Sequence, residues 1–443
     1  TARFLDLRSR ALATLPAPDA LRDRARLLRR HTLANLDRYL AQFAENVERA
    51  GGVVHWARDA AEANTTVVEI ARKAGARTIV KGKSMVTEET GLNAALEAQG
   101  LDVLETDLGE FIAQLAGQHP SHIIVPVLHM TRHQIGRLFA DKLGVPFTDD
   151  PTELAAIARR LLRERFLTAD LGVTGVNFGV ASTGTLSLVT NEGNGRMCSS
   201  MPPVHVAVMG IERLVPTPAD LAVVLQLLAR SATGQKLSVY TSLMTGPRRA
   251  GDPDGPDELH VVLVDNGRTR MLGGELAEIL TCIRCGACLN ACPVYRSIGG
   301  HAYGATYPGP MGSVLTPLFT DLPSYGELAH ASSLCGACRD ACPVRIDLPG
   351  LLLRLRSRSV RDGLAPGWLR AGMRAYARVA TRPVLFRWAG RLGGALSRAA
   401  ARDGWVRRLP GPLAAWTRGR DFPALARKSF QARWAERAPE KRP

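Results

Sequence analysis

The sequence predicts an α/β domain with a mostly parallel sheet, followed by a cysteine-rich domain and a basic helical tail. Three observations lead to this prediction. Short runs of β-branched residues alternate with helical patterns through the first half of the chain. Seven of the eight cysteines lie within one short stretch, and basic residues accumulate after it. We therefore expect four segments, with the boundaries 1–52, 53–271, 272–350 and 351–443.

Residues 1–52 are expected to form an N-terminal helical arm, because apolar residues recur at helical spacing among many arginines between Leu21 and Leu40. The segment 53–271 is the predicted α/β domain, in which helices should stop at Gly or Pro and strands should be rich in Val and Ile. We expect helices at 131–143 and 218–230, and strands at 77–80, 101–106, 121–126, 203–209, 236–240 and 260–265.

The net charge of +16 belongs to the tail. Residues 351–443 contain 22 Lys and Arg but 5 Asp and Glu, and tryptophans are interleaved with the arginines. Such a tail suits nucleic acid, an anionic membrane surface or an acidic protein. We favour docking to an acidic protein, or a simple solvated surface, over binding to nucleic acid. The sequence has no run of about 18 apolar residues and no signal peptide, so we expect a cytoplasmic protein without a transmembrane segment.

The cysteines form two runs. The first has Cys282, Cys285, Cys288 and Cys292 followed by proline, and the second has Cys335, Cys338 and Cys342 followed by proline. This spacing is typical of bacterial two-cluster ferredoxins, in which the last cysteine of each run binds the other cluster. Zinc and disulfides are the weaker interpretations, because zinc sites lack the trailing Cys-Pro and nothing in the sequence indicates export.

Crossed ligands assign Cys282, Cys285, Cys288 and Cys342 to the first cluster and leave Cys292, Cys335 and Cys338 for the second. The second run lacks its leading cysteine, since Ser332 lies three residues before Cys335. The second cluster is therefore either a [4Fe–4S] cluster with a non-cysteine fourth ligand (Ser332, water or a partner's group) or a [3Fe–4S] cluster.

Polar and glycine-rich residues suggest a second site in the α/β domain. The segments 182–185 and 191–196 flank one apolar strand, and the turn 81–84 follows another. Small and polar residues at strand ends suit a ligand crevice, although ordinary turns use the same residue types. The candidate ligand-binding residues are Lys83, Thr183, Gly184, Thr185, Glu192, Asn194 and Arg196. The remaining cysteine, Cys198, is expected to be a small buried side chain rather than a cluster ligand.

Together these motifs resemble the lactate utilisation protein B family of LUD-domain iron–sulfur proteins. The resemblance rests on the segments 80–84, 181–185 and 191–194, the two cysteine runs and the Tyr-Pro-Gly-Pro loop at 307–310, and it covers nearly the whole chain. It implies a NagB/RpiA/CoA-transferase-like fold for the LUD domain, a ferredoxin-like helical cysteine domain and two [4Fe–4S] clusters.

The resemblance also implies a function. The chain would be an electron-transfer subunit of an L-lactate oxidoreductase rather than a complete enzyme, and it would act with a cysteine-rich protein and a second LUD protein in oxidising L-lactate to pyruvate. Two other functions stay open: a stand-alone enzyme of isomerase or acyl-transfer type with structural clusters, and a nucleic-acid-binding iron–sulfur protein. No catalytic residue is assigned.

Overall fold

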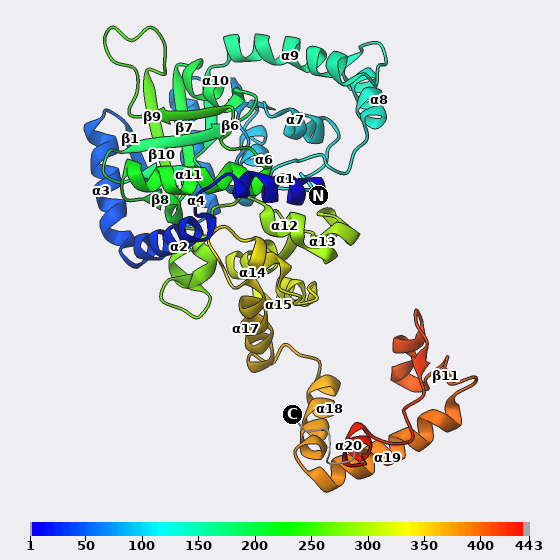
Figure 1. Ribbon diagram of the computed structural model, residues 1–443. Coiled ribbons are helices and arrows are strands. Elements are labelled where there is room, and N and C mark those ends of the chain that lie inside the picture. The colour runs from blue at the N-terminus through cyan, green and yellow to red at the C-terminus, as the bar shows by residue number, and fades with distance from the viewer. Residues whose placement is uncertain (1, 437–443) are drawn as a thin grey trace. The chain divides into compact units, whose positions relative to one another are not determined.

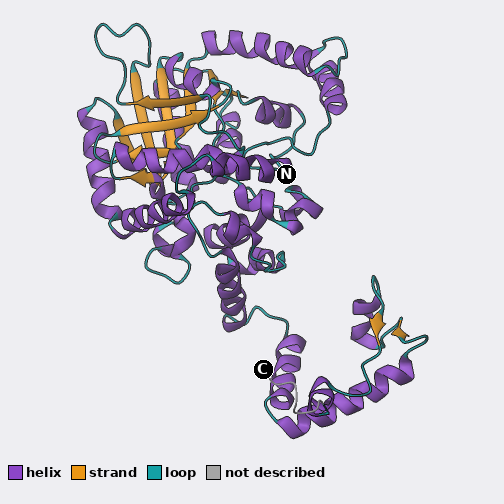
Figure 2. Cartoon of the chain, in the orientation of Figure 1, coloured by secondary structure: helices purple, strands orange, loops and turns teal. Residues whose placement is uncertain are grey.

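Six short strands, each with at least one valine, form a fully parallel sheet in the order β1-β10-β7-β4-β2-β3 (Figures 1 and 2). The central strand β7 is buried along its whole length, as expected of a parallel sheet covered on both faces. The predicted mostly parallel α/β sheet is therefore confirmed. The strands are β1 (Val53–Ala57), β2 (Thr78–Lys81), β3 (Asp102–Glu105), β4 (Leu171–Gly175), β7 (Val204–Gly210) and β10 (Glu258–Val264).

A smaller mixed sheet has the order β8-β5-β6-β9. Its strands are β5 (Phe178–Val180), β6 (Thr185–Thr190), β8 (Leu214–Val215) and β9 (Tyr240–Met244). The two antiparallel pairings, β5 with β6 and β6 with β9, make β6 an inner strand. The residues at the two ends of β6 are therefore held in fixed positions.

Eight α-helices of the described chain connect the strands of the two sheets, and several begin at a side-chain cap. Thr131 caps α8 (Arg132–Leu143), and Gly144 ends it in the left-handed conformation, as the sequence predicts. The predicted helix at 218–230 is α11 (Pro218–Ala232). The others are α4 (Ala60–Lys73), α5 (Met85–Thr90), α6 (Leu92–Glu97), α7 (Leu108–Leu115), α9 (Pro151–Thr168) and α10 (Asn194–Ser200).

Two strand predictions were wrong. The segment 121–126 forms turns, because the Nδ1 atom of His122 accepts the backbone N–H groups of Ile124 and Val125 and so replaces a strand ladder. The strand expected at 236–240 begins only at Tyr240, where pairing with β6 starts. The glycine-rich stretch after residue 169 contains the central strand β4, which the sequence pattern did not reveal.

The N-terminal arm consists of α1 (Ala2–Ala13), α2 (Pro18–Ala34) and α3 (Leu36–Arg49). Arg29 of α2 is fully buried and donates hydrogen bonds to the carbonyl groups of Glu212, Leu214, Leu280 and Thr281. A single side chain of the arm thus joins the α/β domain to the segment that precedes the first cysteine.

The cysteine-rich region is built of short helices. They are η3 (Ala277–Thr281), α12 (Ala287–Ala291), α13 (Pro293–Ile298), η4 (His301–Tyr303), α14 (Gly309–Phe319), α15 (Leu322–Tyr325), η5 (Gly326–His330) and α16 (Ala337–Ala341). The following helix, α17 (Leu348–Arg361), packs against α14, α16 and η5. It therefore belongs with this region, although the sequence analysis places most of it in the tail.

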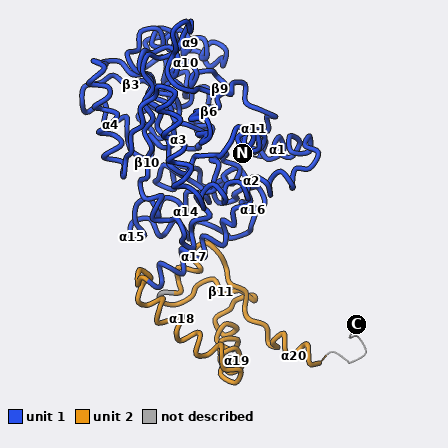
Figure 3. Tube along the Cα trace, turned by 90° about the vertical axis from the view of Figure 1, so that its left-hand side faces the viewer, with its two compact units in different colours: residues 1–361 blue, residues 362–443 orange. Residues whose placement is uncertain are grey.

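The computed structural model describes residues 2–436 and divides into two compact units at Arg361 and Asp362 (Figure 3). Residue 1 and residues 437–443, which the predicted arm and tail include, lie outside the described range. The second unit contains α18 (Gly367–Ala380), α19 (Pro383–Ala400), β11 (Trp405–Val406), η6 (Gly411–Thr417), β12 (Phe422–Pro423) and α20 (Phe430–Ala435). Within the described residues, no helix has the length and apolar character needed to cross a bilayer.

Candidate iron–sulfur site and adjoining cavity

Four cysteines from the two runs line one small cavity. They are Cys282, Cys285, Cys288 and Cys342. Apolar side chains, including Met311 and Leu348, complete the wall. The cavity thus brings together the four residues that the spacing predicts for the first cluster. Four convergent thiols in an apolar pocket are the donor set that a [4Fe–4S] cluster requires.

Burial and neighbouring thiols shift the pKa values of several of these cysteines. Burial raises the pKa of Cys342 to about 11, and the nearby Cys282 raises it further. Burial raises the pKa of Cys338 to about 12, with a further contribution from Cys292. Cys335 is exposed, and a hydrogen bond from the backbone of Ala337 lowers its pKa. Cys338 and Cys292 thus lie close enough to interact electrostatically. All eight cysteines of the described chain are free thiols.

Backbone N–H groups point at three of the sulfur atoms. Arg284 donates to the Sγ atom of Cys282 at 3.4 Å, Tyr295 donates to Cys292 at 3.5 Å, and Ile346 donates to Cys342 at 3.4 Å. Such donors stabilise negative charge on sulfur, and in iron–sulfur proteins they influence the reduction potential. The loops are thus arranged to hold thiolates.

Arginines from other segments donate hydrogen bonds to the backbone of the cysteine loops at the first site. Arg8 of α1 donates to the carbonyl of Ala341 at 2.8 Å, and Arg22 of α2 donates to the carbonyl of Cys342 at 2.8 Å. Arg213 of the α/β domain donates to the carbonyl of Cys282 at 2.9 Å. The cysteine loops are thus fixed both by the N-terminal arm and by the α/β domain.

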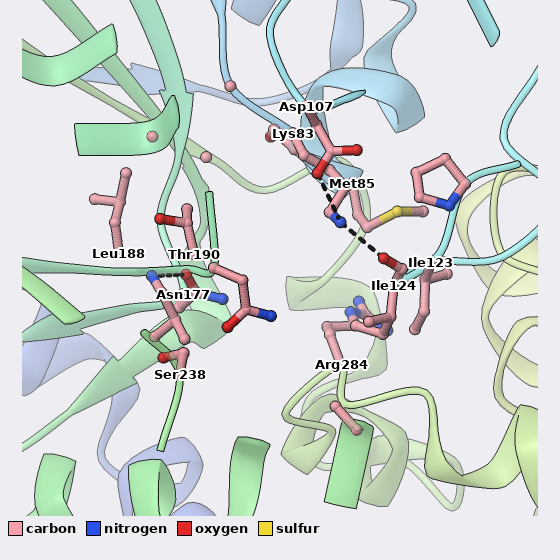
Figure 4. Close-up of a pocket in the computed structure, with 18 of the residues that line it drawn as sticks. Lys83, Met85, Asp107, Ile123, Ile124, Asn177, Leu188, Thr190, Ser238 and Arg284 are labelled. Carbon is pink, nitrogen blue, oxygen red and sulfur yellow. Dashed lines mark hydrogen bonds and ion pairs between the residues drawn. The ribbon is translucent and has the colours of Figure 1, made fainter. Parts of the chain in front are cut away.

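A much larger cavity of about 560 Å³ lies in the α/β domain, a size suited to a small-molecule ligand (Figure 4). Ile123, Ile124 and Leu188 contribute to its apolar wall, and Asn177 and Thr190 are among its polar residues. Three of the predicted ligand-binding residues line it, namely Lys83, Glu192 and Asn194.

Lys83 is a predicted ligand-binding residue and contributes a cation to this cavity. Its Nζ atom donates to the carbonyl of Ile124 at 2.9 Å and to Asp107 at 3.3 Å (Figure 4). Burial opposes the charge, but Asp107 and Glu110 raise the pKa of Lys83 above its ordinary value. An ammonium group has three donors, so one remains for a ligand.

Arg284 connects the first cysteine run to the larger cavity. It lies between Cys282 and Cys285, and its side chain lines the larger cavity (Figure 4). The guanidinium stacks on the ring of Tyr307 at 4.7 Å, and its nearest carboxylate, Glu212, is 3.4 Å away. The sequence pattern did not reveal this role of Arg284, although its position inside a CxxC loop was an available signal.

The other predicted ligand-binding residues lie elsewhere. The turn at the start of β6 contains Thr183, Gly184 and Thr185. The length of β6, roughly 20 Å, separates this turn from Glu192 and Asn194 beyond its other end. Gly184 has φ +68°, and a Cβ atom there would lie 2.5 Å from the backbone nitrogen of Val47, so this glycine allows α3 to pack. Arg196 is exposed on α10 and does not line the cavity.

The turn 81–84 is buried rather than solvated. Lys81 is fully buried, and its Nζ atom lies 2.6 Å from Glu105 and 3.5 Å from Glu88. Its ammonium group therefore serves the packing of β2 and β3. Cys198 is fully buried beside Thr106, as expected of a small core residue, and burial raises its pKa to about 12.

Three family models match the chain in order: a LUD domain over residues 40–264, a 4Fe-4S dicluster domain over 278–346, and the C-terminal region of lactate utilisation protein B over 361–439. The lactate utilization protein B of Oceanobacillus iheyensis is 50% identical over 93% of this chain and 86% of its own. Those of Macrococcus caseolyticus and Geobacillus kaustophilus are each 49% identical, over 93% of this chain and 87% of their own.

Proposed function

We propose that this chain, which belongs to the lactate utilization protein B family, is the iron–sulfur electron-transfer subunit of a complex that oxidises L-lactate to pyruvate. The observation that carries the proposal is the position of Arg284, which links the pocket of four thiols to the cavity of the α/β domain. Residues 53–271 would provide the cavity, in a NagB/RpiA/CoA-transferase-like domain, and 272–350 a ferredoxin-like domain.

The residues present fit two clusters with crossed ligands. Cys282, Cys285, Cys288 and Cys342 would hold the first. Cys292, Cys335 and Cys338 would provide three ligands to the second. Clusters at these positions would supply one-electron transfer. Because each last cysteine serves the other cluster, the chain itself keeps the two sites close together.

The chemistry of lactate oxidation suits a chain with two one-electron sites. Converting the alcohol carbon of lactate to a ketone breaks one C–H and one O–H bond, forms a C=O bond and releases two electrons and two protons. This chain would take up the electrons, while the cysteine-rich partner and the second LUD protein complete the complex. Lys83 and Arg284 would bind an organic anion in the cavity, with Glu192 and Asn194 on its polar side.

Electron paramagnetic resonance tests the proposal. Anaerobically purified protein should give iron–sulfur signals after reduction with dithionite, and the same signals should appear with L-lactate once the partner subunits are added. Absence of iron–sulfur signals with dithionite would refute the proposal, and so would a complex whose clusters stay oxidised in the presence of lactate.

The cavity also favours a second candidate, a stand-alone enzyme of isomerase or acyl-transfer type in which the clusters only stabilise the fold. Cys335→Ser distinguishes the two functions, because the second candidate predicts that turnover survives the loss of redox cycling. Lys83→Met tests the cavity in either case: it should weaken anion binding about tenfold or more, as expected for one charged hydrogen bond. Thr183→Val, at the far end of β6, is the matched control.

A further inference from the structure

The two cysteine runs repeat one backbone conformation. Gly286 has φ +73° and Gly336 has φ +87°, and each precedes a five-residue helix, α12 or α16. Each helix ends at a cysteine in extended conformation, Cys292 with φ −75° and ψ 120° and Cys342 with φ −68° and ψ 120°. The two helices also pack against each other. Position by position, the second run therefore corresponds to the first with an offset of 50 residues.

The correspondence extends upstream to a rare conformation. Arg284 has φ +59°, and its counterpart Leu334 has φ +55°. Positive φ is uncommon outside glycine and costs free energy. The described part of the chain has five such non-glycine residues, and two of them occupy this one position of the repeat. The segment before Cys335 is therefore shaped like the segment before Cys285.

This shape places Ser332 where the first run has Cys282. The backbone N–H of Arg284 donates to the Sγ atom of Cys282 at 3.4 Å, and the backbone N–H of Leu334 donates to the Oγ atom of Ser332 at 3.1 Å. Both bonds join a side chain to the residue two positions later. The serine oxygen is thus held by the same contact that holds the thiol.

A partly buried arginine also binds this segment. Arg356 of α17 donates to the carbonyl of Ala329 at 2.9 Å and to the carbonyl of Ser332 at 3.2 Å. Ser332 itself is half-buried.

We propose that the Oγ atom of Ser332 is the fourth ligand of the second cluster, completing the set of Cys292, Cys335 and Cys338. The hydroxyl would lose its proton on binding iron, so one corner of this cluster would have a hard oxygen donor where the first has a soft sulfur. The second cluster should then differ from the first in reduction potential and in the stability of that one iron. This inference rests on the proposed function, because it requires the clusters.

The test exchanges the two ligand types in the full-length, anaerobically purified chain. Ser332→Ala should lose about one of about eight iron atoms per chain and should give a [3Fe–4S] signal in the oxidised protein. Ser332→Cys should keep the iron and shift the reduction potential of one cluster only. Cys282→Ser should shift the potential of the other cluster in the opposite direction. Ser297→Ala, an exposed serine of α13, is the control.

Iron content and spectra of Ser332→Ala that equal those of the unmodified chain would overturn the assignment of Ser332 while leaving the proposed function intact. A Ser332→Cys protein with unchanged potentials would also overturn it, and this variant remains informative if the alanine variant fails to fold. Absence of iron from the unmodified chain would instead refute the proposed function.

Discussion

The two cysteine runs have the same backbone conformation but differ in their surroundings. At the first site Cys285, Cys288 and Cys342 are buried, and arginines from the N-terminal arm and the α/β domain bind its loops. Of the cysteines assigned to the second site, Cys292 and Cys338 are also buried, but Cys335 is exposed. Sequence spacing alone makes the two sites look alike except for one missing cysteine, whereas the structure separates an enclosed site from an open one.

This difference indicates distinct tasks. Under the proposed function the first site would exchange electrons with a bound substrate, because Arg284 brings its loop beside the cavity of the α/β domain. The open site has a cysteine at the surface, where a partner protein can approach. Electrons would therefore enter at the first site and leave at the second.

Removing the crossed ligands should change the two sites more than any other substitution. Cys342→Ala lies in the second run but should abolish the first cluster, because its thiol lines the cavity with the first three cysteines. Cys292→Ala lies in the first run but should abolish the second cluster. Each variant should lose about half of the bound iron, and the two should lose different signals in redox-titrated electron paramagnetic resonance spectra. If each variant lost the cluster of its own run, the crossed assignment would be wrong.

A smaller effect is expected when the enclosure of the first site is loosened. Arg29→Met should lower the free energy of unfolding by about 3 kcal/mol, since four buried carbonyl groups would lose their donor. Urea unfolding of the anaerobic protein measures this change.

Arg30→Met is the matched control, because Arg30 is half-exposed and its ion pair with Glu278 at 3.0 Å should contribute less than about 1 kcal/mol. Equal losses in both variants would show that Arg29 does not act through its buried hydrogen bonds.

The smallest effect concerns a surface ion pair between the arm and the second run. Arg345 lies 2.6 Å from Asp23, whose side chain is 56% exposed. Asp23→Asn should reduce the unfolding free energy by about 0.5 kcal/mol at low salt, and the difference should shrink in 1 M salt because the charges are screened. A loss that persists in high salt would indicate a role other than ion pairing.

The sequence predicted the parallel sheet and the helix after Thr131, because each depends on local spacing that a short pattern records. It did not predict the loop at 121–126, where the side chain of His122 satisfies the backbone of an apolar run. It also grouped Thr183 with Glu192, which the structure separates along β6. Arg284 escaped notice because its role depends on contacts with residues more than 20 positions away, such as Glu212 and Tyr307.

Arg284 contacts the first cysteine site and the cavity with different atoms. Its backbone N–H binds the sulfur of Cys282, while its side chain faces the cavity. The guanidinium also interacts electrostatically with Cys282, so an anion that neutralises its charge would change the relative stability of the oxidised and reduced cluster. Thermodynamic linkage makes such coupling reciprocal. Reduction of the first cluster would then change the affinity for the ligand by the same factor, so one residue would couple substrate occupancy to electron flow.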